Sequence, residues 1–91
     1  MSESDLKHQV KDFLTLWGIY NYHNLQGIGA KKGIPDRIMH YQGKVHYLEI
    51  KLPKGKMSAW QLAFQEQCKA DGIGYHIIRS LEDLIEVLKT E

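Results

Sequence analysis

Two strand-like segments joined by only two residues constrain the fold of this chain most. Residues 36–41 and 44–51 favour strands, and Gln42-Gly43 between them is a plausible tight hairpin turn. In a two-residue hairpin Tyr41 faces Lys44, so Asp36 at one end directly faces Glu49 on the same side of the sheet. A bulged three-residue loop would shift this pairing by one residue. The hairpin therefore predicts a sheet in which two carboxylates meet.

Helical and strand-like patterns surround this hairpin. The expected elements are a helix capped by Ser2 and ended by Gly18, a strand over 19–23, the hairpin, a helix from Ser58 to about Asp71, a strand over 75–79 and a last helix capped by Ser80. A strand–helix–strand crossover near the end implies a parallel pair within a mixed sheet. Residues 1–91 are therefore expected to form one domain of α/β (α+β) class in the order αβββαβα.

Length and composition exclude several classes of protein. A chain of 91 residues has room for one small core, and no apolar run is long enough for a transmembrane helix. The acidic, polar start of the chain is unlike a secretory signal. The single cysteine, Cys68, cannot form an internal disulfide. These features predict a cytoplasmic protein that has no membrane partner.

The formal net charge of +1 conceals an uneven distribution along the chain. Residues 31–56 contain seven basic and two acidic residues, a net charge of +5, whereas the rest of the chain carries −4. A basic segment of this kind favours a polyanionic partner such as DNA. Contacts with the phosphate backbone are expected from the lysines of its two loops, which are Lys31, Lys32, Lys54 and Lys56. The alternative for both loops is an ordinary solvated connection.

Asp36 and Glu49 are the only carboxylates between Asp12 and Glu66. Two like charges facing each other are destabilising unless a cation lies between them. Lys51 follows Glu49 by two residues and so projects to the same face of the sheet. Carboxylate oxygens are ligands that Mg²⁺ prefers, and substrate phosphate can supply the rest of its shell. The alternative is an ordinary exposed Asp and Glu, compensated by neighbouring lysines.

Three short blocks of sequence resemble one nuclease family. They are Gly-Ile-Pro-Asp-Arg at 33–37, Tyr-Leu-Glu-Ile-Lys at 47–51 and Ser-Ala-Trp-Gln at 58–61. Their pattern is similar to that of the PD-(D/E)XK nucleases, and more closely to the VRR-NUC branch in its stand-alone bacteriophage form. The resemblance extends from Glu3 to about Leu88. It implies a restriction-endonuclease-like αβββαβ core with a mixed sheet, followed by a C-terminal helix.

The resemblance also implies a set of site residues. A metal ion would be bound by Glu3, Asp36, Glu49 and the backbone carbonyl of Ile50. Lys51 would contact the attacking water or the phosphate, and Gln61 would reach the site from the second helix. The residues themselves offer another interpretation of Gln61, as the partner of Ser58 in a helix capping box. One side chain is not expected to serve both roles at once.

The function implied by the resemblance is hydrolysis of DNA phosphodiester bonds. The chain would be a Mg²⁺-dependent endonuclease, with Mn²⁺ able to substitute, in the cytoplasm of a bacterium or a phage-infected host. It would act as a homodimer that is selective for branched DNA such as four-way (Holliday) junctions. The alternatives are an inactive nucleic-acid-binding module with a nuclease fold, a non-specific DNA nicking nuclease, and a regulatory protein without nucleic acid.

Two further expectations concern residues outside this set. The five histidines show no metal-ligand spacing along the chain, so no histidine metal site is predicted. Trp60, Phe64 and Cys68 recur every four residues and are predicted to lie in the core rather than to stack on bases.

Overall fold

Three helices and four strands make up the computed structural model, which describes residues 1–91. In chain order the elements are α1 (Glu3–Leu16), β1 (Asn21–His23), β2 (Arg37–Tyr41), β3 (Lys44–Ile50), α2 (Ala59–Asp71), β4 (Gly74–Ile78) and α3 (Leu81–Thr90). The predicted order of elements is confirmed, and their bounds differ from the expected ones by one or two residues. None of the helices is both long enough and apolar enough to span a membrane.

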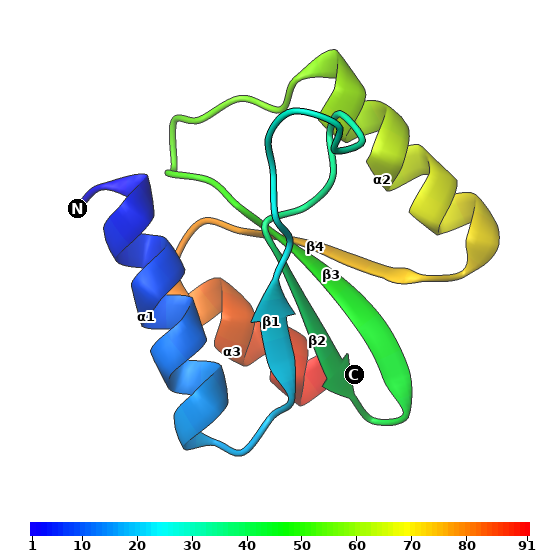
Figure 1. Ribbon diagram of the computed structural model, residues 1–91. Coiled ribbons are helices and arrows are strands. Elements are labelled where there is room, and N and C mark those ends of the chain that lie inside the picture. The colour runs from blue at the N-terminus through cyan, green and yellow to red at the C-terminus, as the bar shows by residue number, and fades with distance from the viewer.

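The strands form one mixed sheet in the order β1-β2-β3-β4. The pairs β1–β2 and β2–β3 are antiparallel, and β3–β4 is parallel because α2 carries the chain back between them. Helices α1 and α3 lie together on one side of the sheet, and α2 lies on the other (Figure 1). The predicted α+β class with a mixed sheet is therefore confirmed.

The turn between β2 and β3 sets the register of the sheet. Gln42 and Gly43 both have positive φ angles, 54° and 74°, as a two-residue type I′ hairpin requires. Tyr41 then pairs with Lys44, and the pairing continues without a bulge to Arg37 and Leu48. The two-residue loop is correct, and the bulged alternative is not formed.

Serine caps open all three helices. In α1 and α2 the side chains of Ser2 and Ser58 accept hydrogen bonds from the backbone amides of the third helical residues, Asp5 and Gln61. The side chains of Asp5 and Gln61 in turn accept hydrogen bonds from the backbone amides of the two serines. Ser80 caps α3 in the simpler one-sided way. These caps satisfy amide groups that otherwise have no partner within the helix. They fix where α1 and α2 begin, at the end of the sheet where β2 starts and β3 finishes.

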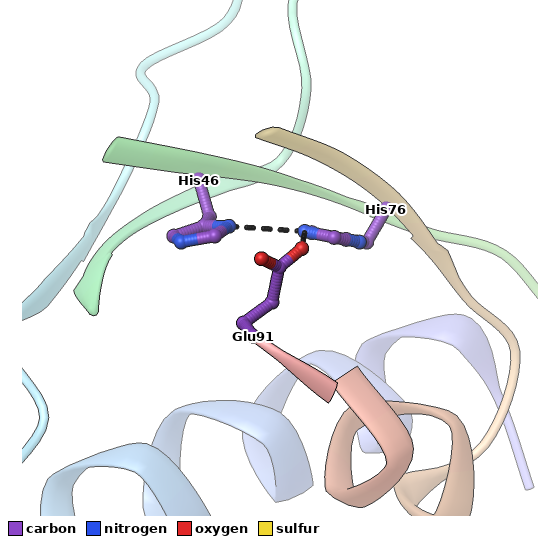
Figure 2. A group of neighbouring side chains, drawn as sticks. All are labelled: His46, His76 and Glu91. Carbon is purple, nitrogen blue, oxygen red and sulfur yellow. Dashed lines mark hydrogen bonds and ion pairs between the residues drawn. The ribbon is translucent and has the colours of Figure 1, made fainter. Parts of the chain in front are cut away.

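The main core lies between the sheet and the α1–α3 layer. It consists of Leu6, Val10, Leu14, Met39, Leu48, Ile50, Ile78 and Leu84. Because side chains alternate along a strand, His46 points to this same side of β3, where it is fully buried next to His76 (Figure 2). Tyr47 points to the other side and packs edge-to-face on Phe64 of α2.

One predicted core residue lies at the surface. Cys68 is buried as expected, but Trp60 is 58% exposed. It stands in the first turn of α2, beyond the edge of the sheet, where the ammonium group of Lys32 lies 5.2 Å from the centre of its ring. The spacing by four residues was correct for a helix but did not show how far the helix extends past the sheet.

We expect Gln42→Asn to raise the free energy of unfolding by about 0.5–1 kcal/mol, because asparagine tolerates positive φ better than glutamine. Gln42 is exposed, so the change removes no packing. Urea unfolding would measure the difference. Gln42→Val, which disfavours positive φ, should lower stability, and an equal effect of the two changes would contradict this account of the turn.

Candidate functional site

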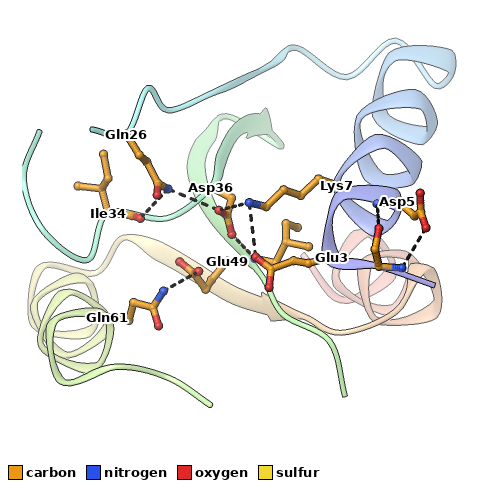
Figure 3. Close-up of polar contacts among 10 residues, drawn as sticks. Glu3, Asp5, Lys7, Gln26, Ile34, Asp36, Glu49 and Gln61 are labelled. Carbon is orange, nitrogen blue, oxygen red and sulfur yellow. Dashed lines mark hydrogen bonds and ion pairs between the residues drawn. The ribbon is translucent and has the colours of Figure 1, made fainter. Parts of the chain in front are cut away.

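The two predicted carboxylates meet where β2 begins and β3 ends. Arg37 pairs with Leu48, so the next pair in the same register is Asp36 and Glu49. Asp36 Oδ2 also accepts a hydrogen bond of 2.7 Å from the backbone amide of Ile50. Figure 3 shows both carboxylates at this end of the hairpin, between the start of α1 and the start of α2.

Glu49 is the most perturbed acid of the site. Its residue is 2% exposed, and one of its carboxylate oxygens, Oε2, is buried with no hydrogen-bond partner. Burial raises the pKa of Glu49 to about 8, and the negative charge of Asp36 adds to this effect, whereas Lys51 opposes it. A buried carboxylate beside a second carboxylate, with an oxygen left free, has the charge and the ligand atoms to hold a cation.

Gln61 performs both of the roles considered for it. Its side-chain oxygen accepts a hydrogen bond of 2.8 Å from the Ser58 amide, and its side-chain nitrogen donates one of 3.1 Å to Glu49 Oε1. The expectation that one side chain could not do both is wrong, because an amide carries a separate donor and acceptor. The helix cap thus aims Gln61 at Glu49.

Lys7, which the sequence analysis did not identify, links Glu3 to the carboxylate site. Glu3 is the first residue of α1, and its Oε1 is 3.4 Å from the ammonium nitrogen of Lys7, one turn later. The same nitrogen is 3.2 Å from Asp36 Oδ1. Partial burial acts to lower the pKa of Lys7, but Asp36 and Glu3 outweigh it and raise the pKa. The i, i+4 spacing of Glu3 and Lys7 on a predicted helix could have indicated this ion pair from the sequence.

Lys51 directly follows β3 and is half-buried. Its backbone amide donates to Ile78 of β4 at 3.0 Å, and its side chain makes no ion pair. Its positive charge acts on Glu49, as the pKa of that residue shows. Lys51 therefore lies near enough to Glu49 for its positive charge to act on that carboxyl, and its ammonium group makes no ion pair.

The loop after Lys51 is held in place by Arg79. The guanidinium group donates hydrogen bonds of 2.7 Å to the carbonyls of Leu52 and Gly55, and one of 3.3 Å to that of Pro53. Lys54 and Lys56 are exposed on this loop. Arg79 thus acts as a structural clamp and is not free to bind phosphate.

The second basic loop packs against the start of α2. Gly33, with φ of +81°, lies so close to the Trp60 carbonyl that a side chain there would collide with it. Lys31 and Lys32 line a groove of about 250 Å³ that Ser58 and Gln61 also line. The loop lysines therefore border the same end of α2 that contacts Glu49.

A basic cleft of about 400 Å³ opens on the other side of Asp36. Cationic and imidazole groups dominate its lining, which includes Lys7, His8, Lys11, His23 and Arg37. Arg37 is 7% exposed, and its Nη1 has no hydrogen-bond partner. Most of these residues lie outside the basic segment 31–56, because the fold brings α1 and β1 to the carboxylates. Sequence charge alone therefore missed this cleft.

Comparison with known proteins identifies no relative of this chain from which the role of the site could be inferred. No model of a known protein family matches the chain, and no curated protein matches its sequence.

In protein kept free of metal, Glu49→Gln should raise the free energy of unfolding at pH 8, by roughly 1–3 kcal/mol, and by much less at pH 5. The pKa of Glu49 rises from 4.5 to about 8 on folding, so between these values the folded state holds a proton that the unfolded state has lost. Wild-type stability therefore falls as pH rises through that window, whereas glutamine has no proton to lose.

Urea unfolding in the presence of a chelator at pH 5 and pH 8 would measure this difference. Glu86→Gln, an exposed change on α3, is the matched control and should show no such pH dependence. A gain from Glu49→Gln that is the same at both pH values would contradict the strained carboxylate pair.

Proposed function

We propose that this protein is a metal-dependent endonuclease that hydrolyses phosphodiester bonds in DNA. One observation carries the proposal: Asp36 and Glu49 face each other across neighbouring strands, and a buried oxygen of Glu49 has no partner. This arrangement costs stability in the absence of a cation, since burial and Asp36 both oppose ionisation of Glu49. A divalent cation bound between the carboxylates would restore this stability, and a metal-dependent nuclease needs a site that binds such a cation.

The donor set fits Mg²⁺, with Mn²⁺ as a substitute. Asp36, Glu49, Glu3 and the backbone carbonyl of Ile50 are the residues that would hold the ion, and all of their donor atoms are hard oxygens. When bound, the ion neutralises charge on the scissile phosphate and lowers the pKa of an attacking water. The free Oε2 of Glu49 supports this assignment, because it is a ligand atom that no protein group uses.

Residues of the chain itself supply the remaining functions. Gln61 holds one oxygen of Glu49 and so fixes the direction in which the other points. Lys51 has an ammonium group without an ion pair and near enough to act on the charge of Glu49, and this group would bind a phosphate oxygen or orient water. Lys7 supplies a second positive charge, between Glu3 and Asp36. These cations act on the charge that develops on phosphate during hydrolysis.

The topology supports assignment to the restriction-endonuclease-like fold and to the VRR-NUC branch of the PD-(D/E)XK nucleases. That core has the order αβββαβ, with its carboxylates and lysine on the hairpin, and α1 to β4 follow this order. Asp36 directly precedes β2, Glu49 lies on β3 and Lys51 directly follows it, an arrangement that supports this assignment. Residues 1–91 then form a single nuclease domain, with α3 added after the core.

Branched DNA, such as a four-way junction, is the proposed substrate. Basic side chains flank the carboxylates on both sides, from the cleft with Lys7 and Lys11 to the groove with Lys31 and Lys32. Such groups bind the phosphate backbone, which favours recognition of DNA shape over base sequence. Lys54 and Lys56 extend this surface beyond Lys51. Two symmetric cuts in a junction require two sites, and a homodimer provides them.

Asp36→Asn and Lys51→Ala should each reduce DNA cleavage by about 10²–10³-fold. The first change removes a charged ligand of the metal ion, and the second removes a positive charge that acts on the reacting phosphate. The assay uses labelled duplex, flap and four-way-junction DNA, with Mg²⁺ or Mn²⁺ and with chelator. Asparagine keeps an oxygen for the Ile50 amide, so the variant should fold normally. Cleavage should be fastest on the junction and absent in chelator.

Asp12→Asn and Lys44→Ala are matched controls, since both residues are exposed and outside the site. They should cleave DNA at the wild-type rate. DNA binding without cleavage in any metal would instead support a non-catalytic binding module. Equal nicking of duplex and junction would support a non-specific nuclease, and a protein that neither binds nor cuts DNA would refute the proposal.

In solution we expect a particle of twice the chain mass of 10.6 kDa at micromolar concentration. Sedimentation equilibrium of the protein alone and with junction DNA measures this mass directly. A monomer in both conditions would contradict symmetric resolution of junctions while leaving the cleavage chemistry untouched.

A further inference from the structure

A buried and a half-buried imidazole meet on the opposite side of the sheet from the carboxylates. His46 of β3 and His76 of β4 are 30 residues apart, and the parallel pairing of the strands brings them together. Nδ1 of His46 is 3.0 Å from Nε2 of His76, with the two rings nearly stacked (Figure 2). No spacing along the sequence indicated this pair, because the two histidines belong to different strands.

The backbone fixes which nitrogen of His46 is available. Its Nε2 lies 3.2 Å from the carbonyl oxygen of Tyr41. A carbonyl only accepts hydrogen bonds, so Nε2 carries the proton and the neutral ring has its lone pair on Nδ1. Histidines that bind metal ions commonly donate their other N–H to a backbone carbonyl in this way. His46 is therefore already oriented as a ligand, with Nδ1 directed at His76.

Glu91 brings a carboxylate to the same point. It follows the last residue of α3, and its Oε1 is 3.6 Å from Nε2 of His76. This carboxylate makes no hydrogen bond, and its oxygen and the two imidazole nitrogens lie within 4.8 Å of one another. Figure 2 shows it approaching the gap between the two rings. Three ligand atoms from three elements thus converge.

Gly74 makes room for this group. It pairs with His46 across the two strands, and a methyl group in its place would collide with Nδ1 of His46. The ring therefore lies in a space that only glycine leaves open. Glycine is unfavourable within a strand, so the glycine at position 74 is explained by the space that the histidine pair requires and not by a strand preference.

We propose that His46, His76 and Glu91 bind one divalent transition-metal ion of the zinc type. Two nitrogen ligands about 2.0–2.1 Å from a tetrahedral zinc are roughly 3.3 Å apart, close to the separation of 3.0 Å between the two rings. To bind, His76 moves its proton from Nε2 to Nδ1, and the ion replaces that proton between the rings. A water molecule completes the four-coordinate shell.

This site is distinct from the carboxylate pair in position and in chemistry. His46 and Glu49 are three residues apart on β3, so their side chains point to opposite faces of the sheet. Imidazole ligands suit Zn²⁺ and Co²⁺, whereas the carboxylates and carbonyl of the other site suit Mg²⁺. The inference does not depend on the proposed nuclease activity.

The ion would fasten the end of α3 to the sheet. The only hydrogen bond that now ties this end to the sheet runs from the Tyr41 hydroxyl to the Leu88 carbonyl, at 2.9 Å. A metal bridge from β3 and β4 to Glu91 adds a second attachment. In a chain of 91 residues, where one small core supplies little stability, such a bridge is a common means of stabilisation.

The test is a titration of the metal-free full chain with Zn²⁺, followed by thermal unfolding, and with Co²⁺, followed by visible absorption. Saturating Zn²⁺ should raise Tm by roughly 10 °C, and Co²⁺ should show the absorption of a tetrahedral site. His76→Gln and Glu91→Gln should each weaken binding by at least about 10–100-fold, which is the loss typical of removing even an outer-shell partner of a metal ligand. His40→Gln, an exposed histidine on β2, is the matched control and should bind as wild type does.

Asp36→Asn separates this site from the carboxylate pair. It should leave the Tm shift caused by Zn²⁺ unchanged. A shift that persists in Glu91→Gln and His76→Gln but disappears in Asp36→Asn would overturn the proposal, as would the absence of any Zn²⁺ binding. Should His76→Gln fail to fold, a zinc anomalous-scattering peak between His46 and His76 in crystals of the wild type decides the question. Zinc-soaked crystals with no such peak would refute the site.

Discussion

The register of the β2–β3 hairpin is the constraint on which the rest of this structure depends. Because Gln42 and Gly43 form a two-residue turn, every residue of β2 has a fixed partner on β3. A slip by one residue would turn the core residues to the wrong face and separate Asp36 from Glu49. The same turn thus decides both how the main core is filled and whether two carboxylates meet.

The approach of these two carboxylates costs folding free energy, and the cost falls mainly on Glu49. Glu49 is buried beside another acid, and one of its oxygens remains unpaired, although Gln61 and Lys51 partly compensate its charge. An isosteric neutral residue would be more stable there in the absence of a cation. Local strain of this kind is typical of a functional site, where groups are arranged for a ligand and not for the stability of the empty protein.

The sheet keeps two kinds of chemistry apart. Alternation along β3 directs Glu49 towards the α2 side and His46 towards the α1–α3 side, three residues away. The carboxylate side is bordered by basic loops and a basic cleft, which suit an anionic polymer and a hard cation. The histidine side lies between the strands and the end of α3, with His46 buried and Glu91 exposed, and it offers softer nitrogen ligands. One short strand can therefore serve both sites without interference between them.

Local signals in the sequence determined the elements, the caps and the hairpin pairing, because each depends on residues only a few positions apart. They also determined that Asp36, Glu49 and Lys51 lie together, since all three are placed by one turn. Only the tertiary structure decided which distant residues join them. Lys7 reaches Asp36 because α1 packs beside the hairpin, and His46 meets His76 because β4 returns parallel to β3. Periodicity describes neighbours within one element, whereas these contacts depend on how separate elements pack.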